Sequence, residues 1–252
     1  MSRCSSGKSR IKAGEQAMTH TLIFVAMTMT LGIFALAADK PATVVMLGDS
    51  ATLSSANKAG SKLTECVQAN LNDTLHVAAV IVNSGKGSDT AKGGYERVEK
   101  DVIAHNPDVV TISFGLNDTG LLTPDEYREW LDKLVRPIQE RTHAKILLVT
   151  STPFNNARHA WGAKFASKGG LDEYMDANIC AATRKIAEQY HLPLCDLHAL
   201  FVEKFKKDPA LMDKLIMPDG VHLTNEGNKA AAEHLAPAIA AVLSPPKTDK
   251  GK

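Results

Sequence analysis

Short apolar runs alternate with amphipathic stretches along most of the chain. The apolar runs predict five strands, over residues 43–47, 77–82, 108–114, 146–150 and 192–195. The stretches between the runs carry apolar residues at helical spacing, for example Leu63, Cys66, Val67 and Leu71. Because the strands are apolar on both faces and alternate with helices, the pattern predicts a parallel sheet that is covered by helices on both sides.

Two of the expected helices contain proline. One begins at Thr123 and Pro124, which are a typical N-cap and a typical first helical residue. We expect Pro137 to kink or end this helix, because proline lacks the N–H that continues the hydrogen-bond ladder. For the same reason we expect Pro237 to interrupt the closing helix, over residues 225–243.

The N-terminal segment has the layout of a secretory signal peptide. A basic start precedes a nearly continuous apolar run of about fifteen residues, 22–36, and a small-residue cleavage pattern. A run of this length falls short of the roughly twenty residues that cross a bilayer. We therefore expect a signal peptide over residues 1–38, cleaved near Ala37/Ala38, and export to the periplasm or out of the cell. An uncleaved N-terminal membrane anchor is the alternative, and Met18 could be the true start in place of Met1.

The composition fits one globular domain over residues 39–245, followed by a polar tail, 246–252, that we expect to be disordered. A net charge of +1 gives no support to nucleic-acid binding. No zinc-type cysteine pair, dinucleotide fingerprint or phosphate loop occurs, so neither a metal site nor a cofactor is predicted. After export Cys66, Cys180 and Cys195 remain, which allows at most one disulfide and favours buried free thiols.

Polar motifs follow the strands of the predicted sheet. Ser50 follows the first strand, a glycine-containing loop over residues 83–90 follows the second, and Asn117 follows the third. Asp219 and His222 come after the fifth strand, just before the closing helix. Because functional loops of a parallel sheet lie beyond the carboxyl ends of its strands, we expect the four motifs to converge on one rim.

Chemistry gives each motif a role. A serine hydroxyl becomes an effective nucleophile when a base takes its proton, and the imidazole of His222 is the natural base. Asp219, three residues earlier, can orient the imidazole and stabilise its charged form. The backbone N–H of Ser50, an N–H from the Gly87–Ser88 turn and the side-chain amide of Asn117 can stabilise an oxyanion.

Four blocks in this order resemble the sequence blocks of the SGNH, or GDSL, hydrolase family. They are Gly48–Ser50, the loop over 83–90, Gly115–Asp118 and Asp219–His222. The resemblance covers nearly all of the chain after the leader. It implies a flavodoxin-like three-layer α/β/α sandwich with about five parallel strands, and serine-dependent ester hydrolysis without a metal.

Carried over block by block, the resemblance implies Ser50 as nucleophile, His222 as base, Asp219 as its orienting carboxylate and Asn117 as oxyanion donor. The chain departs from the family in the second block, which commonly has glycine where Ser88 stands. A serine N–H can still serve if the turn does not require a positive φ. By alignment we favour the N–H of Ser88 as donor, with that of Gly87 close behind.

Residues outside the four blocks receive weaker assignments. The irregular segment 151–170 carries Arg158, His159 and Trp161, which could form a substrate wall or lid. Asp49 and Asp118 are expected to be structural residues that brace their loops. His191 and His198 are expected to lie at the surface or at a strand end.

The sequence favours a secreted esterase that acts on a small acyl ester. Export and polar loops favour an acetylated carbohydrate as substrate. We expect neither a nucleic-acid partner nor a stable membrane span after leader cleavage. A lysophospholipase or thioesterase acting on lipid is the enzymatic alternative. A catalytically silent carbohydrate-binding module is the alternative of another class, and the complete set of Ser50, Asn117, Asp219 and His222 counts against it.

Overall fold

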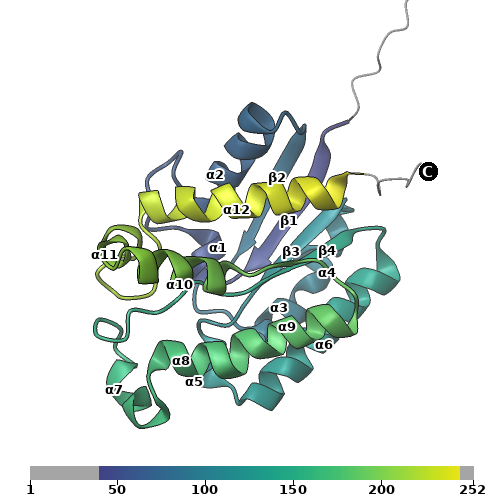
Figure 1. Ribbon diagram of the computed structural model, residues 1–252. Coiled ribbons are helices and arrows are strands. Elements are labelled where there is room, and N and C mark those ends of the chain that lie inside the picture. Colours follow the sequence, from purple (N-terminus) through teal and green to yellow (C-terminus); the bar gives the residue numbers. More distant parts are fainter. Residues whose placement is uncertain (1–39, 245–252) are drawn as a thin grey trace, which may run out of the picture. The chain divides into compact units, whose positions relative to one another are not determined.

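The computed structural model describes residues 40–244, and within them a five-stranded parallel sheet with the order β2-β1-β3-β4-β5 (Figure 1). The strands are β1 (Ala42–Gly48), β2 (Ala79–Gly85), β3 (Val109–Ser113), β4 (Lys145–Val149) and β5 (Leu194–Cys195). The expected signal peptide over 1–38, its cleavage site and the expected disordered tail over 246–252 lie outside the described residues.

Helices cover both faces of the sheet, which confirms the predicted three-layer α/β/α sandwich. The helices on one face are α2 (Leu63–Ala69), α10 (Leu197–Lys207), α11 (Ala210–Leu215) and α12 (Asn225–Leu243). Those on the other face are α3 (Ala91–Glu96), α4 (Val98–Asp101), α6 (Pro124–Arg141), α8 (Leu171–Met175) and α9 (Ala181–Gln189). The short helices are α1 (Ser50–Leu53), α5 (Asp118–Leu121) and α7 (Gly162–Phe165), with π-helical η1 (Asn70–Thr74) and η4 (Asp176–Cys180) and 3₁₀-helical η2 (Ile103–His105) and η3 (Ala166–Lys168).

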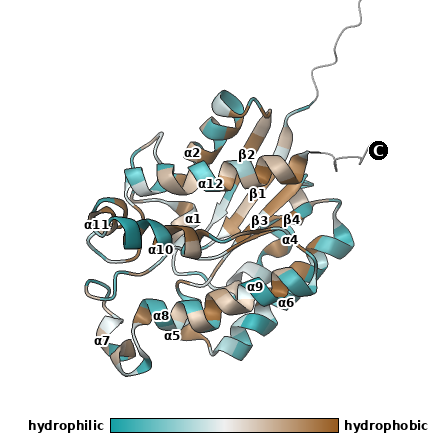
Figure 2. Cartoon of the chain, in the orientation of Figure 1, coloured by the Kyte–Doolittle hydropathy of each residue, from teal (hydrophilic) through white to brown (hydrophobic). Residues whose placement is uncertain are grey.

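Strand β1 shows how the sequence builds two cores. Its side chains alternate between the faces, so that Val45 and Leu47 pack with α6 and α9 while Val44 and Met46 pack with α2 and α12. All four are buried, as expected for an interior strand with neighbours on both edges. The apolar sides of the helices face the sheet in the same way (Figure 2).

The free cysteines lie within these cores. Cys66, Cys180 and Cys195 are buried and unpaired, which confirms the expectation of free thiols.

Strand β2 and the two proline-containing helices differ from what the sequence predicted. Strand β2 lies at the edge of the sheet and is only partly buried, with Val80 51% exposed, so it is not the buried strand that its apolar sequence suggested. Helix α6 continues through Pro137 and α12 continues through Pro237. Each proline leaves one backbone carbonyl without its donor, four residues earlier at Lys133 or Glu233. Both of those residues are at least partly exposed, so solvent can satisfy the carbonyl.

The strand order determines where a site can form. The chain leaves β1 for β2 on one side and enters β3 on the other, so the order reverses between β1 and β3. In open α/β sheets, ligands bind at the carboxyl ends of the strands beside such a reversal. The motifs that begin at Gly48 and Gly115 follow these two strand ends.

None of the helices within residues 40–244 combines the length and apolarity needed to cross a bilayer.

Candidate active site

Ser50, His222 and Asp219 form one hydrogen-bonded chain. Ser50 is the first residue of α1, and its Oγ lies 2.8 Å from Nε2 of His222. On the other side of the ring, Nδ1 of His222 lies 2.7 Å from Oδ2 of Asp219. When Nδ1–H donates to Asp219, Nε2 presents a lone pair to the hydroxyl, which is the arrangement that a general base requires.

The Asp219 carboxylate is held by its own turn. Its Oδ1 accepts from the N–H of Val221 at 3.0 Å and of His222 at 3.1 Å. Burial alone would raise the pKa of Asp219, but these N–H groups and the His222 ring lower it below the ordinary value. Asp219 is therefore ionised and oriented before any substrate binds.

Gly220 allows this turn to pack against the loop after β4. The N–H of Asn155 donates to the Gly220 carbonyl at 2.8 Å, and Gly220 has a φ of 77°. A Cβ at this position would lie 2.6 Å from the backbone N of His159. Glycine is thus required both by the left-handed backbone and by the close approach of the loop.

The three groups expected as oxyanion donors belong to the segments that follow β1, β2 and β3. The N–H of Ser50 lies in the first turn of α1, where helical N–H groups lack acceptors within the helix. The side-chain amide of Asn117 donates one N–H to the carbonyl of Asp89 at 2.9 Å, which leaves its second N–H available. This bond also ties the loop after β3 to the loop that carries Gly87 and Ser88.

Ser88 adopts the left-handed conformation, with a φ of 57°. The condition under which we expected a serine to replace the family's glycine without strain is therefore not met. The backbone here takes the shape that glycine would give it, and Ser88 bears the steric cost of its Cβ. Gly87 is not among the residues with positive φ in the described part of the chain.

Arg97 supports the loops of the site and was missed in the sequence. Its guanidinium contacts Asp89 at 2.7 Å and Asp101 at 2.9 Å, and donates to the carbonyls of Ser84 at 2.8 Å and Gly48 at 2.9 Å. One side chain thereby joins the carboxyl ends of β1 and β2 to the loop that carries Gly87, Ser88 and Asp89. Only the spacing of Arg97 and Asp101 on one helix turn hinted at a pair.

Asp49 and Asp118 are buried braces, in agreement with the structural role expected for them. Asp49 caps α1 by accepting from the N–H of Ala51 at 2.9 Å, and Asp118 accepts from the N–H of Ala91 at 2.9 Å. The second oxygen of each carboxyl is buried without a hydrogen-bond partner. Burial raises the pKa of both carboxyls to about 7.

The structure separates the three residues of the proposed substrate loop. Arg158 turns away to an ion pair with Asp213, 2.7 Å long. His159 and Trp161 form an edge-to-face pair with ring centres 5.1 Å apart. Nδ1 of His159 also accepts from the backbone N–H of Trp161 at 3.2 Å. Burial lowers the pKa of His159, on which the charges of Asp219 and His222 act in opposite directions.

Trp161 lies over the loop that carries Asn117. A Cβ on Gly120, three residues after Asn117, would strike the Trp161 ring. The pair of His159 and Trp161 therefore borders both the Asp219 turn and the oxyanion side of the site. Both side chains keep part of their surface exposed.

A cavity of about 70 Å³ opens beside the Ser50 hydroxyl. Its walls come from Ser50, from the loop that follows it and from the segment at His222. The other lining residues are Ala51, Ser54, Ser55, Ala56, Asn57 and Leu223. Asn57 fixes the loop by donating to the Leu223 carbonyl at 3.1 Å. The cavity is small and its lining mixes hydroxyls with methyl groups.

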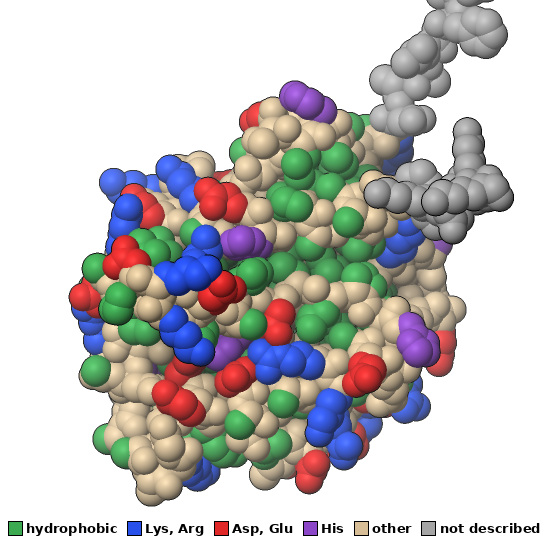
Figure 3. Space-filling view, in the orientation of Figure 1, with side chains coloured by type: hydrophobic (Ala, Val, Ile, Leu, Met, Phe, Trp, Pro, Cys, Tyr) green, Lys and Arg blue, Asp and Glu red, His purple; other side chains and the backbone are tan. Residues whose placement is uncertain are grey.

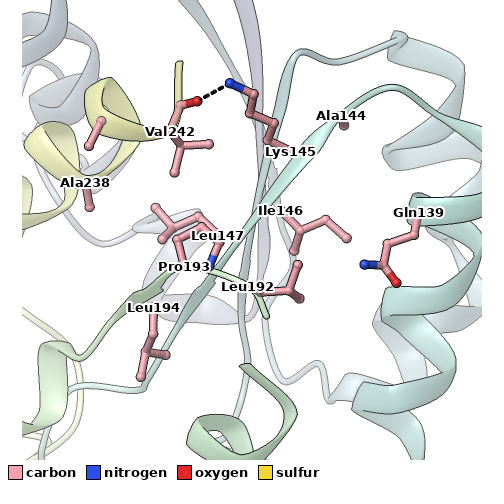
Figure 4. A pocket seen from close by; sticks show the side chains of 11 residues that line it. Gln139, Ala144, Lys145, Ile146, Leu147, Leu192, Pro193, Leu194, Ala238 and Val242 are labelled. Carbon is pink, nitrogen blue, oxygen red and sulfur yellow. Dashed lines mark hydrogen bonds between the residues drawn. The ribbon is translucent and has the colours of Figure 1, made fainter. Parts of the chain in front are cut away.

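A much larger cavity lies elsewhere, with a volume of about 570 Å³ (Figure 4). Its walls include Lys145, Leu147 and Leu192 near the amino ends of β4 and β5, and Ala238 and Val242 of α12. These strand ends are opposite to the carboxyl ends that carry Ser50. In the space-filling view hydrophobic side chains gather in the hollow beside α12, while charges of both signs are interspersed around it (Figure 3). The groove therefore does not contribute to the Ser50 site.

The sequence profile of the GDSL-like lipase/acylhydrolase family matches residues 46–230, well over half of the chain. The chain belongs to this family. Its members hydrolyse acyl esters with an active serine, and the protein is accordingly an ester hydrolase of the serine type.

Two relatives in sequence are informative. An uncharacterized lipoprotein, YqeF, of Bacillus subtilis is 29% identical over 172 residues, which are 61% of this chain and 70% of that protein. An acetylxylan esterase of Xylanibacter ruminicola is 27% identical over 165 residues, which are 57% of this chain and only 31% of that protein.

Solved structures share the fold. The lipase/acylhydrolase of Enterococcus faecalis superposes with a TM-score of 0.65 at 21% identity, covering 82% of this chain and 100% of that one. The acetyl xylan esterase AlAXEase gives a TM-score of 0.63 at 22% identity, covering 78% of this chain and 99% of that one. At these identities the likeness establishes the three-layer fold.

Proposed function

We propose that the protein is a carbohydrate O-acetyl esterase with Ser50 as nucleophile, His222 as base and Asp219 as orienting carboxylate. The observation that carries the proposal is the hydrogen-bonded chain from Ser50 Oγ through His222 to Asp219, at 2.8 and 2.7 Å. This is the contact pattern by which a serine hydroxyl is activated for acyl transfer.

In the proposed reaction, Oγ of Ser50 attacks the acetyl carbonyl while Nε2 of His222 takes the hydroxyl proton. The N–H groups of Ser50 and of the Gly87–Ser88 turn, with the amide of Asn117, stabilise the oxyanion. His222 then gives the proton to the departing sugar oxygen, leaving an acetyl-enzyme. Water, deprotonated by His222, releases acetate and restores Ser50.

The size of the cavity beside Ser50 supports an acetyl group. A space of about 70 Å³ accommodates a two-carbon acyl group but not a long chain. The polar side chain of Ser55 at its wall also fits a small polar ester better than a lipid.

The aromatic pair supports a sugar as the alcohol part of the ester. His159 and Trp161 lie in the loop that packs against the Asp219 turn, and partly exposed aromatic rings suit the apolar face of a pyranose. The acetylxylan esterase among the relatives acts on such a substrate. Arg158, held by Asp213, is left out of the proposed contact surface.

We also infer that the protein acts outside the cytoplasm. This rests on the leader-like sequence over residues 1–38, and a relative that is a lipoprotein supports it.

Two assays test the substrate. We expect p-nitrophenyl acetate to be hydrolysed with a kcat/KM about 100-fold above that of p-nitrophenyl octanoate, since added methylenes have no place in the small cavity. We also expect acetate release from acetylated xylan. A preference for octanoate would favour the lipid acyl hydrolase, and hydrolysis of neither ester by the folded protein would favour the silent binding module.

A further inference from the structure

Three potential metal ligands meet outside the Ser50 site, between η4 and the start of α10. Asp176 and Cys180 stand at the two ends of η4, and His198 lies in the first turn of α10. One ligand atom of each residue lies within 4.8 Å of the others. The side chains of Cys180 and His198 are buried, whereas that of Asp176 is 44% exposed and opens the cluster to solvent.

The two ring nitrogens of His198 have different surroundings. Nε2 lies 3.1 Å from Oδ1 of Asp172 with hydrogen-bond geometry. Nδ1 lies 3.3 Å from Oδ1 of Asp176. When Nε2–H donates to Asp172, Nδ1 turns a lone pair toward the Asp176 carboxylate. In that tautomer Nδ1 and Oδ1 of Asp176 face each other as two electron-pair donors, which a shared cation would hold together, and Arg184 already lies 2.7 Å from the same carboxylate oxygen.

A carboxylate behind a histidine is also the usual support of a metal-binding imidazole. It fixes the tautomer and turns the other nitrogen toward the ion. Asp172 is itself anchored, because its Oδ1 accepts from the N–H of Phe154 at 2.8 Å. His198 is thus buried and oriented in the first turn of α10 and does not lie at the surface, which was one of the two places expected for it.

We propose that Asp176, Cys180 and Nδ1 of His198 bind a divalent ion of the zinc class, with Asp172 as the outer carboxylate. Thiolate, imidazole and carboxylate together are ligands that Zn²⁺ accepts in tetrahedral sites. On binding, the metal–sulfur bond replaces the S–H bond of Cys180, and the proton leaves to solvent. Water enters the fourth position from the exposed side of Asp176.

The neighbouring cation does not prevent binding. Arg184 contacts Oδ1 of Asp176 at 2.7 Å, but it also makes two bonds to Asp196, at 2.6 and 3.2 Å. It therefore keeps a carboxylate partner when Asp176 turns to the metal. The spacing of these residues in the sequence does not indicate the site, because His198 comes from a different element from the other two ligands.

The ion would join η4 to α10. It would lie near Phe154, in the loop that carries His159, because Asp172 contacts both His198 and the Phe154 N–H. We therefore expect it to raise the unfolding temperature without being required for ester hydrolysis. The proposal is independent of the proposed substrate, so failure of one leaves the other standing.

Cobalt titration of the metal-free protein tests the site. We expect one equivalent of Co²⁺ to produce a thiolate-to-metal absorption band in the near ultraviolet, which Zn²⁺ removes by displacement. Cys180→Ala and Cys180→Ser should lose the band, and Cys66→Ala, which removes another buried thiol, should keep it. Asp172→Asn should weaken the affinity about 10- to 100-fold.

Thermal unfolding supplies the second readout. Zn²⁺ should raise the melting temperature of the wild type and of Cys66→Ala but not of the Cys180 variants. Absence of the band in the wild type, or an equal band in Cys180→Ser, would overturn the proposal.

Discussion

Ser88 and Gly220 both hold left-handed backbone conformations, with φ values of 57° and 77°. Ser88 belongs to the loop after β2 and Gly220 to the turn between Asp219 and His222. The site therefore depends on left-handed backbone at two positions, which glycine adopts freely at 220 and serine adopts at a steric cost at 88. The sequence block with serine in place of glycine already pointed to Ser88, while the crowding at Gly220 arises from a loop about sixty residues earlier in the chain.

Ser88→Gly should stabilise the protein by about 1 kcal/mol, because glycine adopts the left-handed conformation without the steric cost of a Cβ. Hydrolysis should persist, since the donor is a backbone N–H. Urea unfolding measures the difference, with Ser88→Ala as the control that retains the Cβ. A destabilised Ser88→Gly would show that the serine side chain contributes more than its backbone costs.

Gly220→Ala should lower kcat/KM about 100-fold, because the new Cβ displaces the turn that carries Asp219 and His222. Gly169→Ala is the matched control. Its φ of 90° imposes similar backbone strain, but no atom lies within 4 Å of the added Cβ. Equal losses of activity in both variants would contradict the crowding at Gly220.

At the scale of elements, Arg97 connects the ends of β1 and β2 to the loop that carries Ser88. Its contacts are with Gly48, Ser84 and Asp89. Asp89 and Arg97 are 6% and 12% exposed at their side chains, so the pair is buried. Breaking a buried pair leaves an uncompensated charge in the protein.

Arg97→Ala should therefore lower the free energy of unfolding by about 3 kcal/mol. Arg128→Ala serves as the control, since its pair with Asp125 is exposed and should be worth less than about 1 kcal/mol. Chemical denaturation of both variants checks the comparison. Similar small losses would mean that the contacts of Arg97 do not hold the loops together.

The sequence predicted the elements better than the contacts between them. Continuous apolar runs identified every strand, and their alternation with helices predicted the parallel sheet but not the order of its strands. The same rule misjudged β2, because an apolar run does not reveal that a strand lies at the edge. The continuation of the two helices through Pro137 and Pro237 was not predicted for a related reason, since exposure of the freed carbonyl depends on the packed structure.

For the site, strand ends predicted which side chains would meet. The contacts of Ser50, Asn117, Asp219 and His222 follow from their places after the strands. The roles of Arg97 and His198 could not be predicted, because each depends on partners that tertiary packing brings from other elements. The ion pair that removes Arg158 from the substrate loop is of the same kind.

At the scale of the whole molecule, Asp49 and Asp118 link stability to pH. Burial raises the pKa of each carboxyl from 3.8 to about 7. The folded protein therefore keeps two protons in a pH range in which the unfolded chain has released them. Under this linkage the free energy of unfolding falls as the pH rises from about 4 to about 7, where the difference in proton binding ends.

Asp118→Asn should make this fall shallower, because the amide oxygen can still accept from the Ala91 N–H while no proton is exchanged. Asp49→Asn should act in the same direction. Urea midpoints measured across the range test the prediction, with Asp125→Asn, 93% exposed at its side chain, as the control. Parallel pH profiles for the wild type and both buried-site variants would contradict it.

Reaction with a fluorophosphonate probe tests the central claim most directly, because the probe traps a serine that a neighbouring base has activated. Intact mass measurement should show one adduct on the folded wild type, located on the peptide that holds Ser50, and none on Ser50→Ala. A folded wild type that stays unlabelled, or a Ser50→Ala variant labelled to the same extent, would contradict Ser50 as the nucleophile.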